Sequence, residues 1–240
     1  MYDAQSVEQK FDACVQAITA LGFDGLAYSY IPRFQLETKS ESSPVFLASD
    51  SYPKHFLTQY SEQDLAASDF TIREINNGNL APIDWWHYAD AAQLKRSELR
   101  VIEIARYDYG IINGYSIPTM SDERGVAGAS LISFDRTPSG VTELAQRMQQ
   151  AVMYVSQFHQ QVILASDFDL RFKMPLLAQF TPTERLIIDQ LRCGTTSKKL
   201  TSATQASSQK AIARLLQKIS PNDQSRITRE RFFYLLHTLF

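Results

Sequence analysis

The stretch GYSIPTMSDERGVAGASLISF, residues 114–134, decides the fold class of this chain. Its two ends, residues 114–119 and 126–134, carry the apolar and β-branched side chains that are typical of strands, and the turn-rich SDERG separates them. After it, apolar side chains recur at steps of three and four, which predicts a long helix over residues 139–165. The apolar positions of that helix are Val141, Leu144, Met148, Val152, Val155, Phe158 and Val162.

Helical and strand patterns also alternate along the residues before this stretch. We expect helices over residues 5–21 and 93–109 and after Pro53 and Ser68, and strands over residues 26–31 and 44–48. No glycine-rich nucleotide-binding pattern accompanies them. The sequence therefore predicts an α/β protein, with an α/β/α sandwich built around a mainly antiparallel sheet.

Charge is distributed unevenly along the 240 residues. The whole chain has 24 basic and 26 acidic side chains, a net charge of -2, but the segment from Pro175 to the end has ten basic and four acidic ones. That segment therefore carries +6 and the remainder -8. A basic segment on an acidic protein points to a polyanionic partner, and a chance unevenness of a solvated surface is the alternative.

The residues around the change of charge predict a domain boundary. The stretch 168–180 breaks the helical periodicity, so we expect it to be a linker. After it, Thr181 is suited to cap a helix and Glu184 to complete a capping box. We therefore expect one domain over residues 1–167 and a small all-helical domain over residues 181–240.

Several functional classes are not expected from the sequence. No apolar run approaches the roughly 18 residues of a membrane-spanning helix, and the first residues lack the pattern of a signal peptide, so we expect a cytoplasmic protein. Cys14 and Cys193 lie far apart in the chain, which disfavours a disulfide framework and a zinc-thiolate site. The histidines are scattered, and no nucleophilic triad or phosphate-binding loop is visible, so we expect neither a metal site nor an enzyme.

Three blocks of sequence resemble LuxR-type quorum-sensing regulators, and they occur in that family's order. The first is YPKHFLTQY, residues 52–60, followed by Asp69 and by APIDW at residues 81–85; the second is YGIINGYSIP, residues 109–118. The third is Phe180 and Thr181 followed by Glu184, with Gly194 ten residues later, which is similar to the opening of the family's helix-turn-helix. Together the blocks span nearly the whole chain.

The resemblance implies a homodimeric transcription regulator that needs no cofactor beyond a small-molecule signal. Residues 1–167 would form an α/β/α domain that binds an N-acyl homoserine lactone. Residues 181–240 would form a helix-turn-helix domain that binds double-stranded operator DNA.

The resemblance also implies roles for individual residues of the first domain. Tyr52 would donate a hydrogen bond to the amide carbonyl of the ligand, and Asp69 would accept one from its amide N–H. Residues that would line the pocket are Tyr60 and Trp85, with Ser130 as a polar group and Ser133 as the alternative to it. Apart from the resemblance, a carboxylate among aromatic side chains needs a hydrogen-bond donor, and a ligand N–H could provide it.

Two positions depart from the family pattern. Phe56 stands where the family has a lactone-contacting Trp, and Phe70 where a Pro normally follows the Asp. Phe has no N–H, so a lactone carbonyl would lose a hydrogen bond with a net contribution of about 0.5 to 1.5 kcal/mol. The ligand is therefore a lactone in an altered pocket or a different apolar molecule with a polar head; a chain without a ligand is a third possibility.

The basic domain departs further. Its second apolar helix would begin near Ser207 and end at Lys218, but the turn before it is about three residues shorter than the family's. The resemblance places four candidate base contacts at the start of this recognition helix and two candidate phosphate contacts further along: Ser207, Ser208, Gln209 and Lys210, and then Arg214 and Lys218. The alternative is a degenerate regulator that does not bind DNA and sequesters a related regulator in mixed dimers.

Structural explanations exist for the same residues. The aromatic side chains could be ordinary core, and Asp69 could cap the helix that follows it. The stripe from Val141 to Val162 is better explained by intramolecular packing than by a dimer seam. An esterase or lactonase is disfavoured, because the SxxK matches at Ser51 and Ser207 are isolated.

Overall fold

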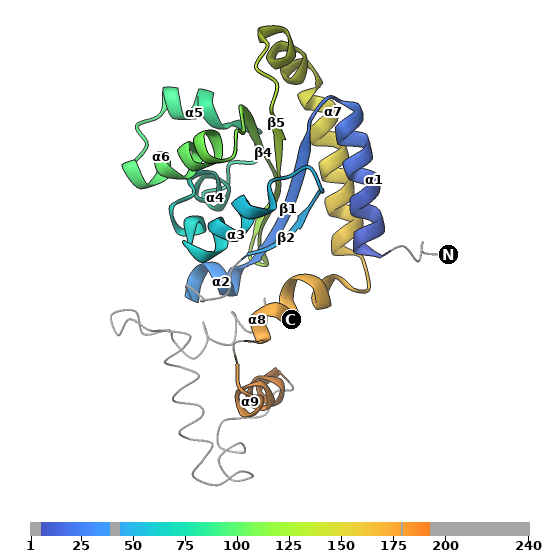
Figure 1. Cartoon of the computed structure of the whole chain (residues 1–240). Helices are drawn as coiled ribbons and strands as arrows, with labels where there is room; N and C mark the ends of the chain where they lie inside the picture. The colour runs from blue at the N-terminus through green and yellow to red at the C-terminus, as the bar shows by residue number, and fades with distance from the viewer. Residues whose placement is uncertain (1–5, 39–43, 179, 193–240) are drawn as a thin grey trace. The chain divides into compact units, whose positions relative to one another are not determined.

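The computed structural model describes residues 6–38, 44–178 and 180–192 (Figure 1). These residues fall into two compact units. The first unit contains residues up to 30, then 44–122 and 126–168, and the second contains residues 31–38, 123–125 and the described residues from 169 onward. Among the described residues, no helix is both long and apolar enough to cross a membrane.

A five-stranded antiparallel sheet forms the centre of the first unit. Its order is β2-β1-β5-β4-β3, and its strands are β1 (Gly25–Pro32), β2 (Val45–Ala48), β3 (Ile83–Asp84), β4 (Asn113–Asp122) and β5 (Gly125–Ser133). Ala27 of β1 lies opposite Ala48 of β2, and Ile83 of β3 opposite Ser116 of β4. The antiparallel α/β sheet that the sequence predicts is therefore confirmed.

Two helices, α1 (Val7–Ala20) and α7 (Pro138–Ile163), pack against each other and cover one face of the sheet (Figure 1). A capping box between Ser6 and Gln9 begins α1, and the Thr137 side chain caps α7. We call this side the packed face. Its side chains include Phe158 of α7, whose ring lies 5.6 Å from Phe11 and 5.0 Å from Tyr28. Most of the apolar stripe of the long helix is thus buried within the unit.

The opposite face of the sheet is covered by short helices (Figure 1). They are α3 (Lys54–Glu62), the 3-10 turn η1 (Leu65–Ser68), α4 (Phe70–Asn76), α5 (Trp85–Ala91), α6 (Arg96–Glu103) and the π-helical turn η2 (Ile104–Asp108). The helix expected over residues 93–109 is therefore shorter at its start and changes to π-helical geometry after Glu103. The sequence patterns did not predict β3 or α5.

The second unit contains α2 (Arg33–Thr38), the π-helical turn η3 (Asp169–Lys173), α8 (Met174–Leu177) and α9 (Pro182–Arg192). The stretch expected to be a linker thus holds two short helical segments. The predicted capping box is confirmed, because the Thr181 N–H donates to Glu184 Oε2 at 2.7 Å and the Glu184 N–H to Thr181 Oγ1 at 3.3 Å. The rest of the predicted helix-turn-helix domain lies outside the described residues.

Candidate functional site

Aromatic rings from the short helices and the loop before them form a buried cluster on the sheet. The structure brings together the five ring residues that the sequence analysis singled out, and each is at most 6% exposed: Tyr52, Phe56, Tyr60, Phe70 and Trp85. The Phe56 ring lies 6.5 Å from that of Tyr52 and 5.9 Å from that of Tyr60. We call these five residues the aromatic cluster.

The strands beneath the aromatic cluster present small side chains to it. The Trp85 indole N–H donates to Ser116 Oγ at 2.9 Å. The Ser116 side chain of β4 therefore points to the face of the sheet that carries the aromatic cluster. A Cβ atom on Gly114 would lie 2.1 Å from Trp85 Cε3, so only glycine leaves room for the indole there. Because side chains alternate along a strand, the small residues on this face are Ala27, Ser29, Gly114, Ser116, Gly128 and Ser130.

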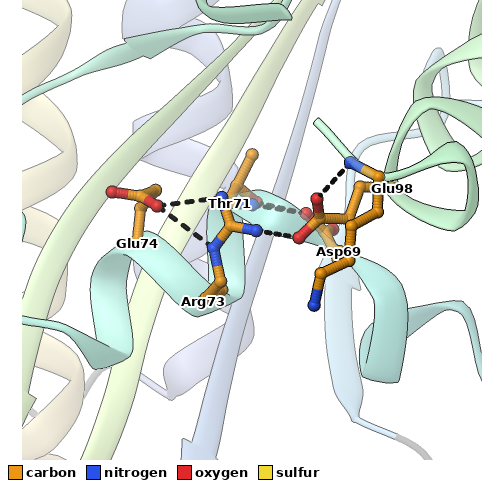
Figure 2. Close-up of polar contacts among 6 residues, drawn as sticks. Asp69, Thr71, Arg73, Glu74 and Glu98 are labelled. Atoms are coloured by element: carbon orange, nitrogen blue, oxygen red, sulfur yellow. Dashed lines mark hydrogen bonds and ion pairs between the residues drawn. The ribbon is translucent and has the colours of Figure 1, made fainter. Parts of the chain in front are cut away.

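Asp69 caps α4 and obtains its hydrogen bonds from the protein. Its Oδ1 accepts from the backbone N–H of Thr71 at 2.8 Å and from the Thr71 hydroxyl at 2.7 Å (Figure 2). Its Oδ2 accepts from the Tyr60 hydroxyl at 2.7 Å. The predicted N-cap role is confirmed, and Thr71 and Tyr60 supply the hydrogen-bond donors that a carboxylate among aromatic side chains needs. A carboxylate oxygen has two lone pairs, so Oδ2 has capacity for one more donor.

Two buried phenols complete the polar part of the cluster. Burial raises the pKa of Tyr52 despite the opposing effect of its hydrogen bond with Ser130, and burial followed by the negative charge of Asp69 raises the pKa of Tyr60. Both phenols therefore stay protonated at neutral pH. Ser130 is the serine that lies against the cluster, while Ser133 Oγ accepts a hydrogen bond from the Asp135 N–H at 3.1 Å.

The indole N–H groups near the cluster are already used. Trp85 donates to Ser116, and the Trp86 indole donates to the Ile112 carbonyl at 2.5 Å. Phe56 has no N–H, and its ring lies 5.4 Å from that of Tyr109. Our sequence analysis gave no role to Tyr109 or Ser116, although both stand within the quoted YGIINGYSIP block.

A charged network joins α4 to α6 beside Asp69 (Figure 2). Arg73 forms an ion pair with Glu98 and a second one with Glu74 at 3.1 Å. Glu98 is 6% exposed, and its Oε2 accepts from the Lys95 N–H at 2.8 Å. The Tyr88 hydroxyl of α5 hydrogen-bonds with Glu74 and Arg73. Sequence reasoning did not find this network, because Arg73 and Glu98 are 25 positions apart and belong to no quoted motif.

The candidate DNA contacts and the second cysteine belong to the C-terminal part of the chain. The candidate DNA contacts lie outside the described residues, as does Cys193: Ser207, Ser208, Gln209, Lys210, Arg214 and Lys218. In the described part of the chain, no group of three or more His, Cys, Asp or Glu side chains is arranged to hold a metal ion.

Comparison with known proteins finds a family and a shared fold. A family model described as "Autoinducer binding domain" matches residues 6–162. The solved structure of SdiA in complex with octanoyl-rac-glycerol shares 16% identity over 98% of this chain and 89% of its own, with a TM-score of 0.51. At 16% identity, this similarity shows a shared fold and nothing further.

Further solved structures are more distant. Escherichia coli SdiA in another crystal form shares 13% identity with a TM-score of 0.45, and the match covers 98% of this chain and 93% of the SdiA chain. The LuxR family factor CepR2 from Burkholderia cenocepacia has 18% identity, 73% and 89% coverage, and a TM-score of 0.49. A search of curated proteins finds no match. Because the family model covers well over half of the 240 residues, the chain belongs to the autoinducer-binding family of LuxR-type quorum-sensing regulators.

Proposed function

We propose that the chain is a ligand-responsive transcriptional regulator. Residues 1–167 bind an apolar signal molecule with a neutral polar head at the aromatic cluster, and residues 181–240 bind operator DNA. The active form is a homodimer, with residues 168–180 joining the two functions. Family membership supports the signal-binding part of this proposal.

One observation carries the ligand site. Two hydrogen-bonded pairs lie at the aromatic cluster: the buried Tyr60 with the half-buried Asp69, and the buried Tyr52 with the half-buried Ser130. Desolvating polar groups costs free energy, so a core without a ligand would be better filled by apolar side chains. Small residues beneath the rings favour an elongated apolar guest, whose polar head would meet the hydroxyls and the carboxylate.

The hydrogen-bonding groups favour a head group that both donates and accepts. A lactone carbonyl would find no indole N–H, because Trp85 and Trp86 use theirs within the protein and Phe56 has none. A hydroxyl of an acylglycerol, the class of ligand in the SdiA complex, could donate to Asp69 Oδ2 and accept from Tyr52 or Ser130. We therefore favour a hydroxyl-bearing acyl compound over an acyl homoserine lactone.

Binding to the aromatic cluster is tested with 1-octanoyl-rac-glycerol and N-octanoyl homoserine lactone. A bound ligand stabilises the folded chain by about 2.7 kcal/mol at one hundred times its dissociation constant. We expect the glycerol ester to raise the melting temperature more than the lactone does. Asp69→Asn should reduce that rise, because the amide keeps the helix cap but changes the acceptor facing the ligand.

The control for this test is Asp50→Asn, which removes one charge from an exposed ion pair with Lys54. Its ligand-induced shift should equal that of the unchanged protein. The ligand site would be refuted if neither compound shifts the melting temperature of the unchanged protein.

DNA binding is tested by gel shift on random-sequence DNA at two salt concentrations. Phosphate contacts make binding weaken steeply with salt, so we expect a strong dependence that Arg214→Ala and Lys218→Ala reduce. The shortened turn in the predicted helix-turn-helix favours the second candidate function, sequestration of a related regulator in mixed dimers. Absent or salt-insensitive DNA binding would support that candidate.

A further inference from the structure

We infer that Glu98, assisted by Glu74, makes the site selective against carboxylate head groups by keeping Arg73 away from Asp69. The inference rests on the proposed ligand site, and it names the class of ligand that the site accepts and the class that it rejects. Accepted head groups are neutral and carry an O–H or N–H donor. Rejected ones are fatty-acid carboxylates of the same chain length.

Arg73 lies one helical turn after Asp69, the N-cap of α4. It follows Asp69 by four residues, and its backbone N–H donates to the Asp69 carbonyl at 3.2 Å, which is the spacing of one helical turn. Side chains four apart on a helix are neighbours. An unrestrained guanidinium at this position would be able to pair with Asp69 or with an anionic ligand next to it.

Two glutamates hold that guanidinium instead (Figure 2). Nη1 donates to Glu98 Oε1, while Nε and Nη2 donate to Glu74 Oε1 at 3.2 and 3.1 Å. Glu98 is fixed in place, since it is buried and its other oxygen accepts from the Lys95 N–H at the start of α6. The planar donors of Arg73 are therefore directed at carboxylates of the protein.

The charges around Asp69 then favour a neutral guest. Two glutamates and one arginine sum to one negative formal charge, and Asp69 adds a second. Another guanidinium, Arg106, lies over the Trp86 ring at 4.7 Å but is exposed, so solvent screens its charge. A carboxylate head would meet like charges and be repelled, whereas a hydroxyl or amide would donate to Asp69 Oδ2.

The test compares 1-octanoyl-rac-glycerol with octanoate at neutral pH. Trp85 and Trp86 are the two tryptophans of the chain and lie at the site, so tryptophan fluorescence reports both dissociation constants. We expect the unchanged protein to prefer the glycerol ester by at least about tenfold. Glu98→Gln should lower this preference by about tenfold, because it removes one negative charge and weakens the hold on Nη1 of Arg73, which can then pair with a carboxylate.

Glu74→Gln should shift the preference in the same direction, and it keeps the buried contact of Glu98 intact if Glu98→Gln fails to fold. Asp50→Asn removes the same charge from an exposed site and should leave the preference unchanged. A merely structural role for Glu98 would lower the melting temperature without changing the ratio of the two dissociation constants.

The outcomes separate this inference from the proposed function. Equal binding of ester and octanoate to the unchanged protein, or an unchanged ratio in the folded glutamine variants, would overturn the inference and leave the ligand site standing. Failure of both compounds to bind would overturn the proposed ligand site and the inference together.

Discussion

The two faces of the central sheet use the same strands for different purposes. On the packed face, large side chains such as Tyr28, Ile117 and Leu131 are buried under α1 and α7, and the Tyr28 hydroxyl pairs with His159 Nδ1 at 2.7 Å. On the opposite face, the strands present several small residues, among them Ser116 and Ser130, beside larger ones such as Phe46 and Ile132, and most of the rings come from the short helices and their loops. Leu131 and Ser130 are adjacent in β5 yet belong to different faces. The difference suggests that stability depends mainly on one face and ligand binding on the other.

Leu131→Ala gives the sharpest separation of the two faces. Leu131 is fully buried, so the truncation should destabilise the fold by about 2 to 5 kcal/mol. Its side chain points away from the aromatic cluster, so the dissociation constant of 1-octanoyl-rac-glycerol should stay unchanged in the folded variant. Urea denaturation and fluorescence titration measure the two quantities. If the folded variant bound the ligand more weakly than the unchanged protein does, packing on one face would influence binding on the other.

Gly114→Ala probes the opposite face by overfilling it. The added methyl would overlap the Trp85 ring, so we expect a loss of about 1 to 3 kcal/mol together with weaker ligand binding. Gly78→Ala is the matched control. Its φ of +90° makes the change unfavourable, but no atom lies within 4 Å of the added Cβ. If Gly78→Ala weakened binding as much as Gly114→Ala did, the effect would be general destabilisation.

The sequence predicted most of the packed face and less of the other. The helix over residues 139–165 follows from apolar periodicity, and the two strands before it follow from their apolar and β-branched side chains. In the second unit, the start of α9 follows from the cap at Thr181. All of these signals are local. The short α5 and β3 carry no such period, and the π-helical turn after Glu103 ends a pattern that reads as one helix. Those elements depend on tertiary contacts.

The candidate site shows the same division. Motif spacing gathered the five rings of the aromatic cluster, but it could not show that Asp69 receives donors from Tyr60 and Thr71. Nor could it find the ion pair of Arg73 with Glu98, since charged side chains 25 residues apart give no periodic signal. Side-chain pairing across helices is set by packing, which a single sequence does not display.

Alkaline pH should destabilise both faces through their buried tyrosines. Burial raises the pKa of Tyr28 on the packed face and of Tyr52 and Tyr60 on the other. The folded chain therefore binds more protons than the unfolded chain above the ordinary tyrosine pKa of about 10. Stability is full below that pH and falls as pH rises, by up to about 1.4 kcal/mol per pH unit for each tyrosine. Urea denaturation at a series of pH values measures how steeply the free energy of unfolding falls with pH. Tyr28→Phe should reduce this slope by the contribution of one titrating proton. A free energy of unfolding that does not change with pH would contradict the burial of these tyrosines.

The smallest effects distinguish two serines on opposite faces of β5. Ser130→Ala removes the hydrogen-bond partner of Tyr52, and Ser133→Ala removes the acceptor of the Asp135 N–H. Each should lower stability by about 0.5 to 1.5 kcal/mol, the usual net contribution of one hydrogen bond. Only Ser130→Ala should also weaken the binding of 1-octanoyl-rac-glycerol. Side chains alternate along a strand, so Ser130 and Ile132 point to the aromatic cluster and Ser133 points to the packed face. The two variants should be equally stable, so a difference in their ligand affinity must come from the site itself. A loss of affinity in Ser133→Ala alone would therefore reverse the assignment of the two faces.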